Sequence, residues 1–197
     1  YLTIETISII KSTCQAPRTM TVLRSARSHD MHITTAQLQQ LISHNQFIDQ
    51  EIISLFLEIT CTTLQSSYLD PSFFPDLEDL SWDAVKNRFS NYSRHNATIL
   101  RPDLNTAAAI AIPIHINNNH WVAVTRRNLQ GRIVFLYADD LNDPQSESRI
   151  NQMLSTGNTS PLFRPENSQW INCTNLTNLP HSNECGPRSL LALQTML

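Results

Sequence analysis

Apolar residues in the first half of the chain recur at the spacing of an α-helix. One such stretch begins with a threonine that can cap a helix, Thr34 or Thr35, and carries on one face Leu38, Leu41 and Ile42. Residues 1–30 show no clean period. We therefore predict that residues 1–30 are an N-terminal extension and that the main domain spans residues 31–197.

A second helix is predicted to follow Asp49. That residue can cap a helix, and Glu51 suits its positive end. The apolar stripe behind them is wide and contains Ile52, Ile53, Phe56, Leu57 and Ile59. Two prolines then interrupt the pattern before a short amphipathic helix, which we expect over residues 82–89.

Short runs of β-branched and aromatic residues dominate the second half. The runs AAIAIPIHI, HWVAV and RIVFLYA have the composition of strands, and a turn containing Gly131 separates the last two, which predicts an antiparallel hairpin. A short helix is expected near residues 150–154. With helices before and after these strands, the sequence predicts an α+β fold: a small mixed sheet, largely antiparallel, flanked by helices.

The chain ends in SNECGPRSLLALQTML, where a cysteine directly precedes Gly-Pro. Proline is favoured in the first turn of a helix, so we expect Cys185 at or just ahead of a helix start. Four apolar positions follow, which we expect to be buried: Leu190, Leu191, Leu193 and Met196.

Composition narrows the classes of function. The chain has 197 residues, a net charge of −3 and only 14 Lys and Arg residues, which argues against nucleic acid as a partner. The four cysteines are widely spaced and form no C-x-x-C pair, so we expect no metal site, no cofactor and a reducing compartment such as the cytosol. Since no apolar stretch reaches the roughly 18–20 residues of a membrane span, we expect a soluble protein. We also expect it to be a monomer.

A reactive cysteine needs an activating base. A thiol becomes a thiolate most readily at a helix N-terminus beside an imidazolium, and Cys185 is predicted to have the first of these. Among the seven histidines, His120 stands where HWVAV begins, at an end of the predicted sheet. In an antiparallel pair the start of one strand neighbours the end of the next, so His120 should meet Asp139 or Asp140 of YADDL. The pattern predicts a nucleophile, a base and an orienting carboxylate.

The order His, Asp, Cys resembles the ubiquitin-like-protein protease family, which belongs to the SUMO-protease and adenoviral-protease clan of cysteine peptidases. IPIHINNNHWVAV is similar to its strand and His-Trp segment, YADDL to its Tyr-x-Asp-Ser-Leu, and NECG to its Asp-Cys-Gly. QFIDQEIISLFL and SWDAVKNRF are similar to two upstream helices. The resemblance implies a papain-like architecture of the ubiquitin-like protease type, with His120, Asp139 and Cys185 as the catalytic triad.

Two positions depart from the family pattern. An oxyanion-stabilising glutamine usually precedes the cysteine; at the spacing of the adenoviral branch this chain has Asn178, with Gln169 and Asn175 as rivals. The family's two tryptophans, which form a narrow tunnel for a Gly-Gly tail, correspond here to Trp121 and Phe47. The resemblance thus implies Asn178 as a fourth catalytic residue, and Trp121 and Phe47 as substrate-binding residues.

Other polar residues in these segments receive no catalytic role. His115, which lies between two isoleucines, is expected on the other face of the sheet or in a satisfied hydrogen bond. Asp140, Asp143 and Glu147 are interpreted as a solvated acidic loop.

The resemblance implies a cysteine isopeptidase that cleaves after the C-terminal Gly-Gly of ubiquitin or a ubiquitin-like modifier through a thioester. Ubiquitin is favoured, because members with weakened tryptophan and oxyanion patterns resemble deubiquitinating effectors of intracellular bacteria, for which the compartment is the host cytosol. Two alternatives stay open: an effector acetyltransferase on the same fold, and a module that binds a modifier without cleaving it. The choice among modifiers is expected to depend on a surface of variable loops distant from the catalytic residues, and residues 1–30 and LDPSFFPDLEDLSWD are the candidates for that surface.

Overall fold

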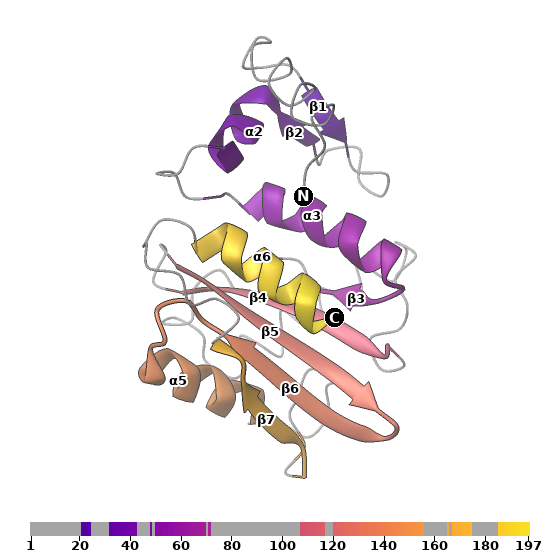
Figure 1. The fold of residues 1–197 in the computed structure, drawn as a ribbon, viewed down its shortest axis with the longest axis vertical. Helices are drawn as coiled ribbons and strands as arrows, with labels where there is room; N and C mark the ends of the chain where they lie inside the picture. Colours follow the sequence, from indigo (N-terminus) through magenta and orange to yellow (C-terminus); the bar gives the residue numbers. More distant parts are fainter. Residues whose placement is uncertain are drawn as a thin grey trace.

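The fold comes from a computed structural model, which describes residues 21–24, 32–42, 48, 50–69, 71, 107–116, 120–155, 165, 167–174 and 185–197. A mixed sheet of five strands forms its centre (Figure 1), in the order β3 (Ser67–Tyr68), β4 (Ala109–Ile116), β5 (His120–Leu129), β6 (Arg132–Ala138) and β7 (Gln169–Asn172). β4, β5 and β6 run antiparallel to one another, whereas β3 and β7 pair in parallel at the two edges. The predicted α+β fold with a mixed, largely antiparallel sheet is confirmed.

The hairpin between β5 and β6 has the turn that the glycine predicted. Gln130 and Gly131 both have positive φ angles, 53° and 85°, which match the two central residues of a type I′ turn. The Asn128 side chain accepts a hydrogen bond of 2.9 Å from the backbone N–H of Gly131. The tight turn fixes the register of β5 against β6, and therefore which residues meet at the opposite end of the hairpin.

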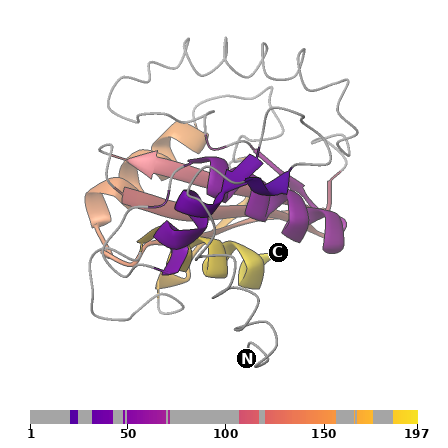
Figure 2. The ribbon, with the colours of Figure 1, turned by 90° about the horizontal axis from the view of Figure 1, so that it is seen from above.

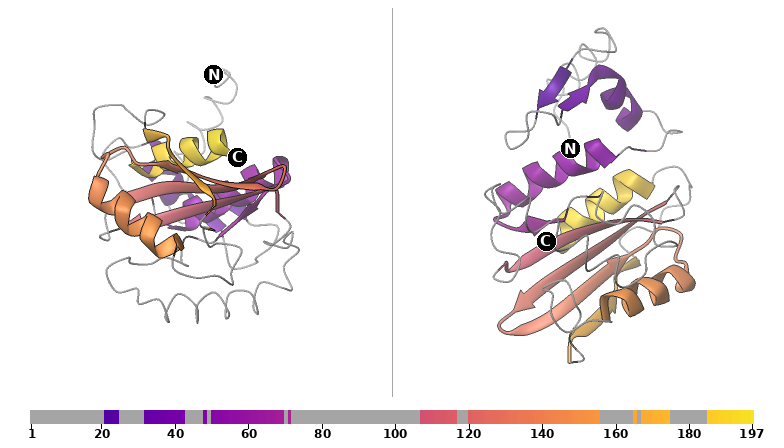
Figure 3. Two further views of the ribbon diagram at one scale, coloured as in Figure 1. Left: turned by 90° about the horizontal axis from the view of Figure 1, so that it is seen from below. Right: turned by 180° about the vertical axis from the view of Figure 1, so that it is seen from behind.

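The described helices are α2 (Thr35–Ile42), α3 (Gln50–Thr63), α5 (Pro144–Ser155) and α6 (Cys185–Met196). α6 lies against one face of the sheet and α5 against the other, as the edge-on view of Figure 2 shows. Seen from behind, α5 runs beside β6 and β7 (Figure 3). Among the described residues, no helix has both the length and the apolar character that crossing a membrane requires.

Side chains of different size line the two faces of the sheet. The face toward α6 and α3 carries three fully buried alanines, Ala111, Ala123 and Ala138. The opposite face carries the isoleucines and valines of β4 and β5 and packs on Ile150 and Leu154 of α5. This division follows from the period of two along each strand. Because a methyl group takes little room, the alanine face lets α6 lie close to the sheet.

The N-terminal segments form a second sheet, and Ile33 of its second strand packs in the core shared by α3 and α6. β1 (Thr21–Arg24) and β2 (His32–Thr34) make a two-stranded antiparallel sheet that joins the two sides of the predicted boundary between residues 30 and 31. α2 begins directly after Thr34, as the sequence predicts. The Thr34 hydroxyl accepts from the Gln37 backbone N–H, and the Gln37 side chain accepts from the Thr34 N–H at 2.8 Å, which is a reciprocal capping box.

Three details of the helices differ from the sequence expectation. Ile59 of α3 and Leu191 of α6 were expected in buried stripes, but they are 55% and 59% exposed. α5 is longer than predicted and starts at Pro144, because the Asp143 carboxylate caps it by accepting from the Ser146 backbone N–H at 3.2 Å. The helix predicted over residues 82–89 lies outside the described residues.

Candidate active site

The β5–β6 hairpin brings His120 and Asp139 together, as its register requires. His120 is the first residue of β5, and Asp139 directly follows the last residue of β6. Ala123 pairs with Ala138, so both residues lie at the same end of the strand pair. His120 Nε2 is 2.6 Å from Asp139 Oδ1, and both side chains are buried. The pairing expected from the sequence is present in the structure.

The Asp139 carboxylate is held by three further donors. Its Oδ1 also accepts from the backbone N–H of Leu141 at 3.0 Å. Its Oδ2 accepts from the Tyr137 hydroxyl at 3.0 Å and from the backbone N–H of Asp143 at 3.1 Å. With both oxygens engaged, the carboxylate cannot rotate freely, so it presents one fixed oxygen to the imidazole.

These contacts set the protonation states. Burial alone would lower the pKa of His120, but its hydrogen bonds to Asp139 and Cys185 and their charges raise it from 6.5 to about 9. Burial alone would raise the pKa of Asp139, yet the hydrogen bond and charge of His120 and two backbone donors hold that pKa below its ordinary value. Burial, and then the charge of Asp139, raise the pKa of Tyr137, which keeps its hydroxyl a donor. The site therefore favours an imidazolium beside a carboxylate at neutral pH.

Cys185 is the first residue of α6 and is 1% exposed. Its thiol hydrogen-bonds to the imidazole of His120. Because Nε2 of that ring faces Asp139, the ring nitrogen toward the sulfur is Nδ1. The thiol thus lies at the partly positive N-terminus of a helix, beside the imidazole of His120.

A hydrogen bond fixes α6 against β5 beside the histidine. The Ser189 hydroxyl, one turn into α6, donates to the carbonyl oxygen of Trp121 at 2.7 Å. Trp121 directly follows His120 along β5. The strand that carries the base and the helix that carries the thiol are thus connected one residue after His120 and four residues after Cys185.

Trp121 is buried, with 3% of its surface exposed. Its indole stacks on the His115 ring at a centroid distance of 4.3 Å, so His115 lies on the same face of the sheet as Trp121 and not on the opposite one. The indole N–H donates to the carbonyl oxygen of Ile48 at 3.2 Å. The Ile48 side chain packs so closely on Gly186 that a Cβ at that position would lie only 3.1 Å from it. Ile48 therefore contacts both Trp121 and the first turn of α6.

The acidic residues after β6 do not form a solvated loop. The Asp140 side chain is 2% exposed, with Oδ1 3.5 Å from His120 Nε2 and Oδ2 3.5 Å from Arg188 Nη1. Asp143 caps α5, and Glu147 accepts hydrogen bonds from the side chains of Trp170 and Asn172. The interpretation as a solvated loop was wrong for Asp140, because α6 supplies a partner for its buried side chain from a distant part of the sequence. Asp143 and Glu147 are only part-buried, and both make specific hydrogen bonds.

The ligand-type atoms of His120, Asp139 and Asp140 lie within 4.8 Å of one another. Asp139 already accepts four hydrogen bonds, and Arg188 places a positive charge beside Asp140. The two carboxylates are therefore already engaged by hydrogen-bond donors and by a cation. The group is better suited to holding an imidazolium than a metal cation.

The residues expected to stabilise an oxyanion are placed only in part. Asn178 and Asn175 lie outside the described residues, as does Phe47. Gln169 is exposed at the start of β7 and pairs with Val134 of β6. Val134 precedes Asp139 by five residues, or about 16 Å of extended strand. Gln169 is therefore distant from the triad and poorly placed to serve it.

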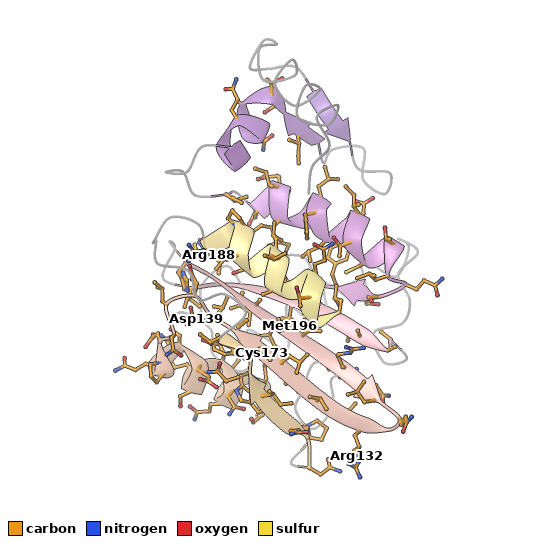
Figure 4. The ribbon with its side chains drawn as sticks, viewed as in Figure 1. Arg132, Asp139, Cys173, Arg188 and Met196 are labelled. Atoms are coloured by element: carbon orange, nitrogen blue, oxygen red, sulfur yellow. The ribbon has the colours of Figure 1, made fainter. Side chains whose placement is uncertain are left out.

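The structure brings both Asp139 and Asp140 to the histidine, where the sequence predicted one or the other, and adds Arg188 beside Asp140. Sequence reasoning missed Arg188 altogether. The available signal was its position three residues after Cys185, which places both on the same side of a helix. Figure 4 shows the Arg188 side chain at the N-terminal end of α6, near the end of the sheet that carries Asp139.

Comparison with known proteins agrees with this geometry. The family model of the Ulp1 protease family, C-terminal catalytic domain, matches residues 46–197. Comparison with curated protein sequences finds no significant match.

Solved structures share the fold at low sequence identity. The Ulp1 protease domain in complex with Smt3, the yeast ortholog of SUMO, matches at a TM-score of 0.68 and 12% identity, over 98% of this chain and 82% of that one. The catalytic domain of the Chaetomium thermophilum Ulp1-like SUMO protease matches at a TM-score of 0.70 and 13% identity, over 99% of this chain and 79% of that one. The Xanthomonas campestris effector XopD bound to ubiquitin matches at a TM-score of 0.52 and 12% identity, over 76% of this chain and 74% of that one.

The family match covers the helix α3, the whole sheet and the helix that begins with the cysteine. Within that span lie the three groups that the structure joins by hydrogen bonds, His120, Asp139 and Cys185. The chain therefore belongs to the Ulp1 protease family and carries that family's cysteine peptidase catalytic domain.

Proposed function

We propose that this chain is a cysteine isopeptidase that cleaves after the C-terminal Gly-Gly of ubiquitin or a ubiquitin-like modifier. The observation that carries the proposal is the unbroken connection from Asp139 through His120 to Cys185 at a helix N-terminus. Two solved relatives carry a modifier: the Ulp1 domain is in complex with Smt3, and XopD is bound to ubiquitin. Ubiquitin is the first candidate, by analogy with effector deubiquitinases that depart from the family pattern in similar places.

The proposed reaction has two stages. In the first, the Cys185 thiolate attacks the carbonyl carbon of the terminal glycine, and the His120 imidazolium donates its proton to the departing amine. In the second, neutral His120 removes a proton from water, which attacks the thioester carbonyl; the carbon–sulfur bond breaks and restores the Cys185 thiolate beside the His120 imidazolium, and the modifier leaves as its acid, which ionises in water. Asp139 holds the imidazole and stabilises its charged form throughout.

Three further residues are assigned by the same proposal. Asn178 donates its side-chain N–H to the oxyanion, together with the backbone N–H of Cys185 in the first turn of α6. Trp121 and Phe47 narrow the approach to the thiol so that only glycines pass. Ile48, the neighbour of Phe47 in sequence, supports the last assignment: its carbonyl oxygen accepts from the Trp121 indole N–H, and its side chain packs against Gly186.

The proposal is tested with ubiquitin, SUMO and related modifiers that carry a C-terminal fluorophore. The wild-type chain should release the fluorophore from one modifier, and Cys185→Ala should not. Cys173→Ala is the matched control, because burial raises the pKa of that thiol and it makes no described contact with the triad; it should retain full activity.

Two outcomes would overturn the proposal. If no modifier is cleaved but Cys185→Ala binds one tightly, the chain is a binding module. If no modifier is cleaved and the wild-type chain consumes acetyl-coenzyme A, it is an acyltransferase.

A further inference from the structure

A second carboxylate faces the histidine of the triad. Asp140 Oδ1 lies 3.5 Å from His120 Nε2, beyond the 2.6 Å contact of Asp139. Among the described residues, Asp140 Oδ1 has no hydrogen-bond donor of its own. Its side chain is 2% exposed, so water does little to screen its charge. The charge of Asp140 therefore acts directly on the imidazole.

Two buried carboxylates on neighbouring residues repel each other. Burial and the charge of Asp139 both raise the pKa of Asp140, while the charges of His120 and Arg188 lower it. Arg188 Nη1 lies 3.5 Å from Asp140 Oδ2. An ionised Asp140 is thus tolerated because cations flank it on two sides.

Arg188 reaches this carboxylate from the helix that carries the nucleophile. It lies three residues after Cys185, on the same side of α6, and is 7% exposed. The contact connects the first turn of α6 with the end of β6, and so with the residue next to Asp139. A buried ion pair adds little net stability on average, because desolvation offsets its attraction; fixing one arrangement is its better attested role.

We propose that Asp140 and Arg188 form a positioning pair of the active site: Asp140 presents a second carboxylate to His120, and Arg188 holds that carboxylate in place from the helix that carries Cys185. The inference deepens the proposed function, since it rests on His120 being the base of that reaction. Neither residue contacts the reacting atoms. Both act through the charge and orientation of His120.

Substitutions of Asp140 and Arg188 should shift the pKa of His120 in opposite directions. Asp140→Asn removes a negative charge beside the imidazole, so the pKa of His120 should fall by about one unit. Arg188→Met removes the cation that offsets Asp140, so the same pKa should rise. The titratable groups that face His120 among the described residues are Asp139, Asp140 and Cys185. Arg188 acts on His120 through Asp140, and the cross-strand partner of His120 on β4 is the uncharged Ile116.

The experiment is an NMR titration of histidine-labelled protein, with the His120 signal assigned by its loss in His120→Gln. Arg132→Met removes a positive charge at the far end of β6 and serves as the control, which should leave the titration unchanged. Arg188→Lys keeps the positive charge, so the pKa of His120 should stay near its wild-type value. If Arg188→Met does not fold, Asp140→Glu takes its place: it should retain the wild-type pKa that Asp140→Asn loses.

The inference is overturned if Asp140→Asn leaves the pKa of His120 unchanged, or if Asp140→Asn and Arg188→Met shift it in the same direction. The titration needs no modifier and no turnover. The pKa of His120 can therefore be measured even if the chain cleaves no modifier. If the chain does cleave a modifier but the substitutions leave that pKa unchanged, only the positioning pair is contradicted.

Discussion

Asp139→Asn tests the electrostatics of the site most sharply. The native carboxylate accepts four hydrogen bonds, two on each oxygen. An asparagine side chain has the same shape but one accepting oxygen, so its NH₂ group must face two donors in either orientation. It also removes the charge that favours the imidazolium of His120.

The magnitude follows from the pKa of His120. That pKa is raised from 6.5 to about 9, a difference of about 2.5 units, and each unit corresponds to 1.36 kcal/mol, or about 3 kcal/mol in all. A raised histidine pKa stabilises the folded state fully below pH 6.5, and this stabilisation is lost as the pH rises through about 9. Asp139→Asn should therefore weaken the fall in unfolding free energy between pH 6 and pH 9.5.

Two assays follow. Urea denaturation at pH 6 and pH 9.5 measures the change in stability, and histidine NMR measures the pKa, which should move from about 9 toward 6.5. The cleavage rate should fall by about 10²–10⁴, the usual contribution of a positioned base. If Asp139→Asn keeps a histidine pKa near 9, the reasoning is refuted, because the carboxylate is then not what sustains the imidazolium.

Two other predictions concern packing. Gly186→Ala places a methyl group 3.1 Å from the Ile48 side chain, so we expect the free energy of unfolding, measured by urea denaturation, to fall by about 1–3 kcal/mol. Adding Ile48→Ala in the same chain should recover part of this loss. If it recovers none, the strain does not come from the contact with Ile48. Glu147→Ala removes the acceptor of the Trp170 indole N–H, so we expect about 1 kcal/mol of destabilisation and altered tryptophan fluorescence, with cleavage unaffected. A loss of activity without a loss of stability would contradict this structural role of Glu147.

The sequence predicted the reactive pair because strand geometry is local. Once HWVAV and RIVFLY are read as a hairpin with a glycine turn, the first residue of one strand and the residues after the other must meet. The Thr34 cap and the helix start at Cys185 likewise depend on a few adjacent residues. Short edge strands gave no comparable signal: β3 has two residues and β7 has four.

Contacts between distant segments could not be predicted in this way. Asp140 and Arg188 are 48 residues apart, and their pairing depends on how closely α6 lies on the alanine face of the sheet. The exposure of Ile59 and Leu191 has a similar cause, because a wide apolar stripe does not indicate where the neighbouring surface ends. Asp143 was different, since Asp-Pro before a helix was a readable signal that the acidic-loop interpretation overlooked.

The most direct test of the central claim is incubation with a panel of modifiers that carry a C-terminal electrophile, followed by mass spectrometry of the adduct. The account predicts a covalent bond between one modifier and Cys185, absent in Cys185→Ala and retained in Cys173→Ala. An adduct that forms on another cysteine, or none with any modifier, would contradict the assignment of Cys185 as the nucleophile of a modifier-specific protease.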